Sequence, residues 1–196
     1  KSKSIMSSIL NVNTIQNATG TAAMGINSNG VVTRNVIPAW NLNLPDDYSG
    51  TSAGSAVQIN DWGTNSHSVT SAQVAKTNFI QGGCSVNTGV VTVPVTGLYN
   101  ISTHLRLQNI GNGDYAYASI SINNETATGA LNKFGGAEIL DTKPSQDDYW
   151  NYPAARASLI ANLTANDTVR VMVVVESDTS WGVNYTHTHF KGYLIG

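Results

Sequence analysis

Short segments in which apolar and polar residues alternate, each ending at a glycine or asparagine turn, most constrain how this chain folds. Leu98 to Leu107, Tyr115 to Ile122 and Val169 to Val175 are three such segments, rich in β-branched and aromatic residues. A period of two places successive side chains on opposite faces of a strand, whereas an amphipathic helix needs a period of 3.6. The pattern therefore predicts an all-β domain.

Three more segments complete the expected set of strands. Val86 to Val95 leads into a Thr96-Gly97 turn, Ala154 to Leu163 precedes an Asn166-Asp167 turn, and Tyr185 to Ile195 forms the last strand. Many short strands separated by Gly, Asn and Asp turns predict a β-sandwich or a jelly roll.

The composition narrows the classes of function. Charged residues are only 11% of the 196 residues, against roughly 25% in ordinary soluble domains. The net charge is -2 and there is no cluster of Lys and Arg, so we expect no nucleic-acid partner. No apolar run is long enough for a membrane-spanning helix, so we expect no membrane insertion. Cys84 is the only cysteine, which excludes an intramolecular disulfide and a cysteine-based zinc site.

Residues 1–37 differ from the rest of the chain. Between residues 7 and 36 apolar residues are sparse and turn pairs are frequent, so this segment cannot bury a core alone. A partner protein or other copies of the chain would order it, or it would stay unordered. We place a domain boundary near Ile37-Pro38, with residues 1–37 as a stem or docking segment and residues 38–196 as the β domain.

Four motifs of the β domain resemble the C1q/TNF-like family. They are the opening Pro38-Ala39-Trp40, the segment GVVTVPVTGLY from Gly89 to Tyr99, LTANDTVRV from Leu163 to Val171, and the closing FKGYLI from Phe190 to Ile195. Asn166 stands where the family pattern has a glycine. The resemblance implies a ten-stranded jelly roll that assembles as a tight homotrimer. It implies a binding or structural role, with no catalytic residues and no cofactor.

The N-terminal segment is similar to the start of tail-fibre and other virion proteins of marine tailed bacteriophages. The similarity rests on MSSILNVNTIQ from Met6 to Gln16 and on AMGINSNGVV from Ala23 to Val32. It implies that this segment attaches the protein to other virion proteins, and that the protein is located on the virion, in a tail fibre or another external appendage.

The last strand contains two histidines two positions apart. Alternation groups Thr186, Thr188 and Phe190 with Gly192 and Leu194 on one face, and the members of the other face are His187, His189, Lys191, Tyr193 and Ile195. We expect the Phe190 set to face the sandwich core. We expect the other set to face the trimer interface or its threefold axis, through His187, His189, Tyr193 and Ile195.

Three histidine pairs of this kind, one from each copy on a threefold axis, can complete an octahedral metal site, so His187 and His189 are the candidate metal ligands. The alternative, which we prefer, is that no metal is bound and that these are hydrogen-bonded or exposed interface histidines. Crowded imidazoles repel one another when protonated, so in either geometry we expect the trimer to weaken below about pH 6.

An aromatic loop supplies the candidate ligand-binding residues. Aromatic rings stack on sugar faces while carboxylates and amides read hydroxyls, so we predict that Asp148, Tyr149, Trp150 and Tyr152 contact a receptor. The alternative is that one or two rings anchor the core or the trimer interface. Trp62 and Trp181 are open to the same two interpretations. The carboxylate pairs Asp46-Asp47 and Asp147-Asp148 are calcium candidates or solvated loop residues.

The nucleophile-elbow pattern GTSAG, from Gly50 to Gly54, lacks the preceding strand and following helix that this motif requires, so we expect an ordinary loop. The sequence thus favours a trimeric fibre or adhesion tip that binds a host surface glycan or protein, and no enzyme. The alternatives are a purely structural decoration or collar protein and a secreted cellular C1q-like binding protein. A depolymerase is a further, less favoured hypothesis.

Overall fold

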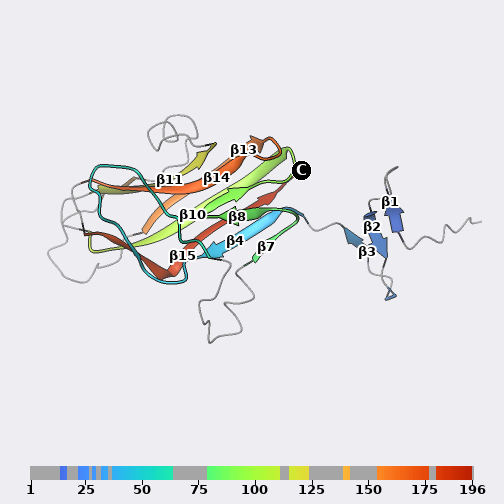
Figure 1. Ribbon diagram of the computed structural model, residues 1–196, viewed down its shortest axis with the longest axis horizontal. Helices are drawn as coiled ribbons and strands as arrows, with labels where there is room; N and C mark the ends of the chain where they lie inside the picture. Colours follow the sequence, from blue (N-terminus) through green and yellow to red (C-terminus); the bar gives the residue numbers. More distant parts are fainter. Residues whose placement is uncertain are drawn as a thin grey trace, which may run out of the picture. The chain divides into compact units, whose positions relative to one another are not determined.

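The computed structural model describes residues 14–16, 22–26, 28–29, 32–34, 37–63, 79–110, 115–123, 139–141, 154–176 and 180–195. Within these ranges all regular structure is β, and all strand pairing is antiparallel (Figure 1). The predicted all-β class is confirmed. The described part of the chain contains no apolar helix of membrane-spanning length.

The chain divides into two compact units, Lys1–Ile37 and Pro38–Gly196. The described residues of the first unit form a small antiparallel sheet in the order β1-β2-β3, made of Thr14–Gln16, Ala22–Ile26 and Val32–Arg34. The division coincides with the change in composition near Ile37-Pro38. The role of the first unit in attachment stays a prediction.

The first large sheet of the second unit has the strand order β13-β10-β15-β4-β7, and a short strand β5 also pairs with β15. Its strands are β4 (Ala39–Asn43), β5 (Tyr48–Ser49), β7 (Phe79–Gln81), β10 (Gly97–Gln108), β13 (Ala154–Leu163) and β15 (Gly182–Leu194). The closing strand β15 therefore lies inside the sheet, hydrogen-bonded to β10 on one side and to β4 on the other.

The second large sheet has the order β12-β11-β14-β9-β8, and a short strand β6 pairs with β14. Its strands are β6 (Val57–Gln58), β8 (Ser85–Asn87), β9 (Val90–Thr92), β11 (Tyr115–Ile122), β12 (Ile139–Asp141) and β14 (Thr168–Val175). The predicted segments Tyr115 to Ile122 and Ala154 to Leu163 match the bounds of β11 and β13.

The core lies between the two sheets, as expected of a β-sandwich. β10 and β14 alternate between buried and partly exposed residues, and the buried set of each strand belongs to the core. Phe190 of β15 is fully buried, with its ring centroid 5.6 Å from that of Trp40 and 5.8 Å from that of Trp62. Trp181 is also buried, and its indole N–H donates to the carbonyl oxygen of Ser52. Both ambiguous tryptophans are thus core residues.

The prediction of one strand from Val86 to Val95 is wrong. A tight turn at Thr88-Gly89 splits this segment into the hairpin β8–β9. Both turn residues have positive φ, 47° and 74°, which matches the backbone twist that short hairpins favour. The turn at Asn166 also has a positive φ, 75°, a conformation that asparagine tolerates and glycine adopts readily. Asparagine is therefore suited to this turn position.

Two glycines make room for two buried tryptophans. A Cβ atom at Gly192 would lie 2.3 Å from Cζ2 of Trp40, and one at Gly50 would lie 2.2 Å from Cε2 of Trp181. Both contacts are far shorter than van der Waals distance, so neither position accepts a side chain while the indole stays in place. Gly192 is therefore needed in the closing strand because Trp40, on the neighbouring strand β4, lies directly against it.

We expect Gly192→Ala to lower the free energy of unfolding by about 2 to 4 kcal/mol, because the added methyl group displaces the Trp40 ring. Urea denaturation followed by tryptophan fluorescence measures this loss. Trp40→Phe leaves a smaller ring, so the double variant Trp40→Phe/Gly192→Ala should lose less stability than the sum of the two single losses. Strict additivity would contradict the proposed contact.

Candidate functional site

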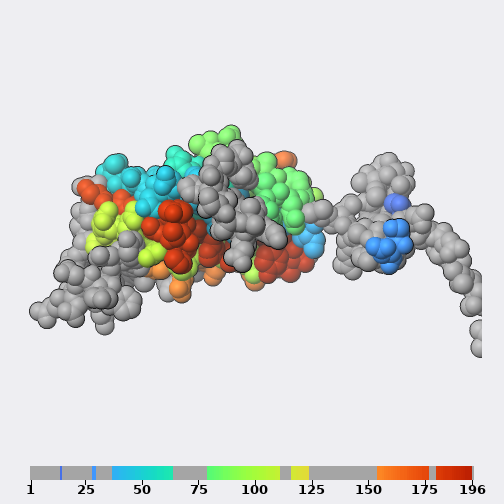
Figure 2. All heavy atoms as spheres, turned by 90° about the horizontal axis from the view of Figure 1, so that it is seen from below, coloured from blue at the N-terminus to red at the C-terminus, as the bar shows by residue number. Residues whose placement is uncertain are grey.

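The outer face of the β10/β15 sheet, on the side away from the core, holds most of the predicted site residues that the structure describes. We define it by the outward side chains of β13 (Arg156, Ser158, Ile160, Asn162), β10 (Leu98, Asn100, Ser102, His104), β15 and its end (His189, Lys191, Tyr193, Ile195), β4 (Asn41, Asn43) and β7 (Phe79, Gln81). In Figure 2, residues of β15 (red) reach the surface along this side of the molecule.

The predicted division of the last strand into two faces is confirmed from Thr188 onward. Thr188, Phe190 and Gly192 are buried, whereas Lys191 and Tyr193 are exposed and His189 is half-buried. The prediction for Thr186 is wrong: this residue is exposed, although it was expected with the core set. On the other side of Thr186, Val183 is buried. The buried positions thus change from odd to even numbers within the strand.

A β-bulge causes this change. The register runs from Arg106 opposite Asn184 to His104 opposite His189, so β15 advances five residues while β10 advances two. The three additional residues, an odd number, reverse which side chains face the core. The buried Thr188 hydroxyl accepts a hydrogen bond from the backbone N–H of Arg106 at 2.9 Å, which satisfies a group that the broken ladder would leave unpaired.

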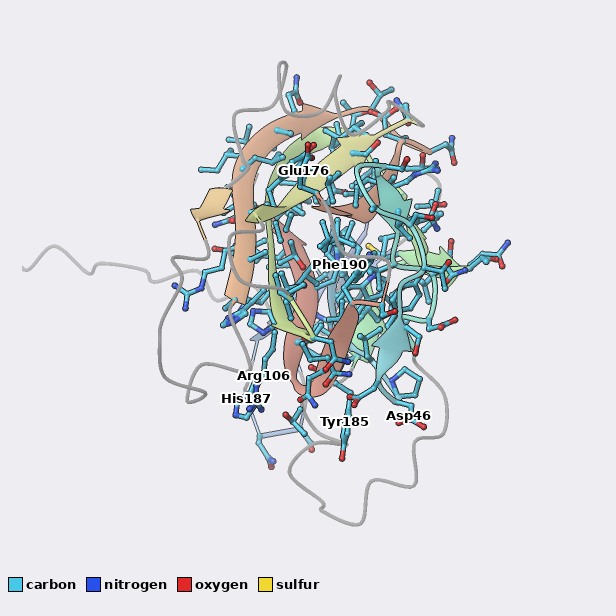
Figure 3. The ribbon with its side chains drawn as sticks, turned by 90° about the vertical axis from the view of Figure 1, so that its left-hand side faces the viewer. Asp46, Arg106, Glu176, Tyr185, His187 and Phe190 are labelled. Atoms are coloured by element: carbon cyan, nitrogen blue, oxygen red, sulfur yellow. The ribbon has the colours of Figure 1, made fainter. Side chains whose placement is uncertain are left out.

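His187 lies on this bulge. Its Nδ1 atom is 2.8 Å from Nη1 of Arg106 and 2.8 Å from the hydroxyl oxygen of Thr186. Because a guanidinium only donates, Nδ1 acts as the acceptor in the Arg106 contact. Figure 3 shows Arg106 beside His187 at the lower edge, with Tyr185 and Asp46 further along the same edge, while Phe190 lies in the interior. The backbone N–H of Tyr185 donates to the Asp47 carboxylate at 2.9 Å.

His189 has different neighbours. Its ring lies edge-on to the ring of His104 on β10, with centroids 5.6 Å apart, and Arg156 on β13 is the residue opposite His104. Burial lowers the pKa of His189 to about 4, helped by the positive charges of Lys191, His104 and Arg156. At neutral pH this imidazole is therefore uncharged. We name Arg156, His104, His189 and Lys191 the cationic row, after the two permanently charged residues, Arg156 and Lys191.

The other half of the outer face carries exposed apolar side chains, and we call it the apolar half. Tyr193 and Ile195 are 50% and 49% exposed, and Ile160 is 62% exposed. Leu98 lies in the same half, and Phe79 lies on the same face in line with Lys191. Five of the eight exposed large apolar side chains among the described residues therefore belong to this one face. The side-chain amide of Asn100 donates a hydrogen bond to the Tyr193 hydroxyl at 3.2 Å. Apolar groups concentrated on one face mark an interaction surface.

The structure does not bring His187 and His189 together as a metal-binding pair: one imidazole contacts Arg106 and the other contacts His104. Within the described ranges, no group of three or more His, Cys, Asp and Glu side chains is placed to hold a metal ion. The ligand-binding candidates Asp148, Tyr149, Trp150 and Tyr152 lie outside the described residues, as does Asp147.

The remaining sequence motifs have structural roles where the structure describes them. Gly50 to Gly54 is a loop, as expected, and its Ser52 carbonyl binds Trp181. The Asp47 carboxylate accepts hydrogen bonds from the backbone N–H of Tyr185, near the start of β15, and from the Gln108 side-chain amide at 3.2 Å. The half-buried Cys84 thiol has its pKa raised to about 11, chiefly by burial. It is therefore protonated at neutral pH.

Sequence reasoning missed His104, Arg156 and Ile160 as site residues. Alternation within Leu98–Leu107 and Ala154–Leu163 does place all three on the strand face that points away from the core. Their proximity to His189 depends on the order β13-β10-β15, which joins strands distant in sequence. Topology, rather than any local motif, assembles the row.

No protein-family model matches the sequence, and no curated protein matches it.

The buried hydrogen bond in the bulge gives one test. Thr188→Val keeps the shape of the side chain but leaves the Arg106 N–H without its acceptor, so we expect a loss of about 1 to 3 kcal/mol in the free energy of unfolding. Thr92→Val, at a half-exposed position of β9, should change stability by less than about 0.5 kcal/mol. Chemical denaturation of both variants measures the difference, and equal effects would contradict this role of Thr188.

The lowered pKa of His189 gives a second test. An unfolded histidine, with a pKa near 6.5, binds a proton more readily than folded His189, so acid favours unfolding. We expect stability to fall as the pH drops from about 6.5 to about 4, by about 1 to 2 kcal/mol after allowing for solvent screening at a half-buried site.

His189→Gln should remove this part of the pH dependence. Lys191→Gln should reduce it, because one of the charges that lower the His189 pKa is gone. Denaturation curves at fixed protein concentration between pH 7.5 and 4 provide the measurement. Identical pH profiles for the wild-type chain and His189→Gln would show that another group is responsible.

Proposed function

We propose that this protein is a homotrimeric fibre or adhesion tip, attached to a virion through its N-terminal unit and binding a host surface glycan or protein through its β domain. The observation that carries the assembly is the concentration of exposed apolar side chains on the outer face, where Ile160, Tyr193 and Ile195 are half-exposed or more. Such a surface is stabilised when copies of the chain cover it.

Strand pairing supports a jelly roll within the sandwich. Eight main strands follow one another in the chain: β4, β9, β10, β11, β12, β13, β14 and β15. The first pairs with the eighth, the second with the seventh, the third with the sixth, and the fourth with the fifth. This is the pairing expected when one long antiparallel ribbon folds over into two sheets. The same fold is implied by the resemblance to the C1q/TNF-like family.

The two ends of the β domain differ in a way that supports this function: one end would attach to the virion, and the other would face the host. The N–H of Leu194 donates to the carbonyl oxygen of Pro38 at 2.9 Å, so the domain begins and β15 ends at the same place. The bulge with Arg106 and His187 lies at the far end of β10. A strand of twelve residues spans about 40 Å. Attachment through residues 1–37 would leave the bulge end facing outward.

In this function the chain binds and carries out no chemistry. Three identical contacts on one trimer combine into a strong attachment even when each is weak. A purely structural decoration or collar protein has the same fold and assembly, and it differs only in lacking affinity for the host. Binding of the purified trimer to host cells, or to their surface polysaccharide, separates the two functions.

We expect sedimentation velocity at micromolar concentration to give a trimer. Ile160→Glu introduces a charge at a position that is 62% exposed in the single chain, so folding should tolerate it while the assembly is lost. Ser85→Glu, at an exposed position of β8 in the opposite sheet, should remain a trimer. A folded wild-type chain that sediments as a monomer would refute the assembly.

A further inference from the structure

The sheet that carries the outer face has an unusual charge balance. Its six strands contain two arginines, one lysine and three of the four histidines of the chain, but no Asp and no Glu. The whole chain has more acidic than basic residues, 12 against 10. Negative charge is thus excluded from the strands of this sheet, although it is in excess elsewhere.

The cationic row concentrates this charge. Arg156, His104 and His189 lie directly opposite one another on three adjacent strands, and Lys191 is the next outward residue along β15. Neighbouring strands are about 4.8 Å apart, so the three outer residues span about 10 Å. The described part of the chain supplies no carboxylate to either Arg156 or Lys191, and both side chains are exposed.

Covering the outer face with copies of the chain brings these groups toward one another. Burial of the apolar half favours contact, but the same contact removes water from Arg156 and Lys191 in every copy. Like charges repel more strongly as water is excluded, and an arginine side chain cannot lose its proton to avoid this. The neutral ring of His189 keeps one N–H as a hydrogen-bond donor.

We propose that the cationic row is a binding site for an inorganic oxyanion, such as phosphate or sulfate, which is completed when copies of the chain meet across the outer face. This inference rests on the proposed homotrimer. The guanidinium of Arg156 offers paired N–H donors that match two oxygens of such an anion, and Lys191 adds a point charge. The neutral ring of His189 supplies a further N–H donor. The anion neutralises the repeated positive charge and links the copies.

Sedimentation velocity on the full chain tests the site. Samples at pH 7.5 are compared with and without about 10 mM phosphate, and sodium chloride keeps the ionic strength equal. We expect phosphate to tighten the assembly at least about tenfold in its dissociation constant, and sulfate to act in the same direction. At this concentration, the general strengthening of apolar contacts by these salts is small.

Two variants assign the effect to the row. Arg156→Gln should assemble equally well with and without phosphate, because the paired N–H donors are gone and the repulsion between copies is reduced. Arg34→Gln removes the same charge from the N-terminal unit and should keep the full phosphate response. Calorimetric titration of phosphate into the wild-type assembly should show heat of binding that Arg156→Gln lacks.

The outcomes separate this inference from the function on which it rests. A wild-type trimer of equal stability in chloride and in phosphate would overturn the anion site and leave the assembly intact. An equal phosphate response in the wild-type chain and Arg156→Gln would reveal a general salt effect and would also overturn it. A monomer under all conditions would overturn the assembly and the site together.

Discussion

The packing of β15 against Trp40 is the contact on which the rest of the domain depends. Gly192 lets the indole lie flat against the strand, and Phe190, two residues earlier, lies between Trp40 and Trp62. Because β15 sits between β10 and β4, this contact joins the first strand of the domain to the last. It fixes which face of β15 is buried, and therefore which side chains reach the outer face.

The bulge in β15 changes which side chains are buried toward the far end of the strand. Without it, the side chains that face outward near His189 would continue to do so through Val183, and Val183 could not be buried. The bulge lets one long strand bury Phe190 at one end and Val183 at the other, although their numbers differ in parity. The exposed residues between them, including His187, are presented on a backbone that is no longer regular.

Much of the fold follows from local sequence, because a strand with one buried face must alternate. This is why the bounds of β11 and β13 could be predicted to the residue. The β8–β9 hairpin could not, since Thr88 gives no strong turn signal beside Gly89 and the apolar residues continue across it. Alternation also failed at Thr186, because a bulge has no signature in the spacing of residues on one strand.

The candidate site was less predictable than the fold, since it is composed of residues from three strands. His187 and His189 attract attention as a pair in the sequence, yet their rings have separate partners. The grouping of His189 with His104 and Arg156 requires the strand order, which alternation within each strand does not contain. The jelly-roll motifs supplied an expectation of that order, but only as a resemblance.

The two halves of the outer face place opposing demands on any partner. The apolar half, with Ile160 and Tyr193, favours removal from water, whereas Arg156 and Lys191 resist it. An acidic protein would satisfy the charges but gain little from covering isoleucine and tyrosine with charged side chains. A second copy satisfies the apolar half and leaves the charges unmet. A copy of the chain together with a small anion satisfies both halves, so the proposed assembly and the proposed anion site depend on each other.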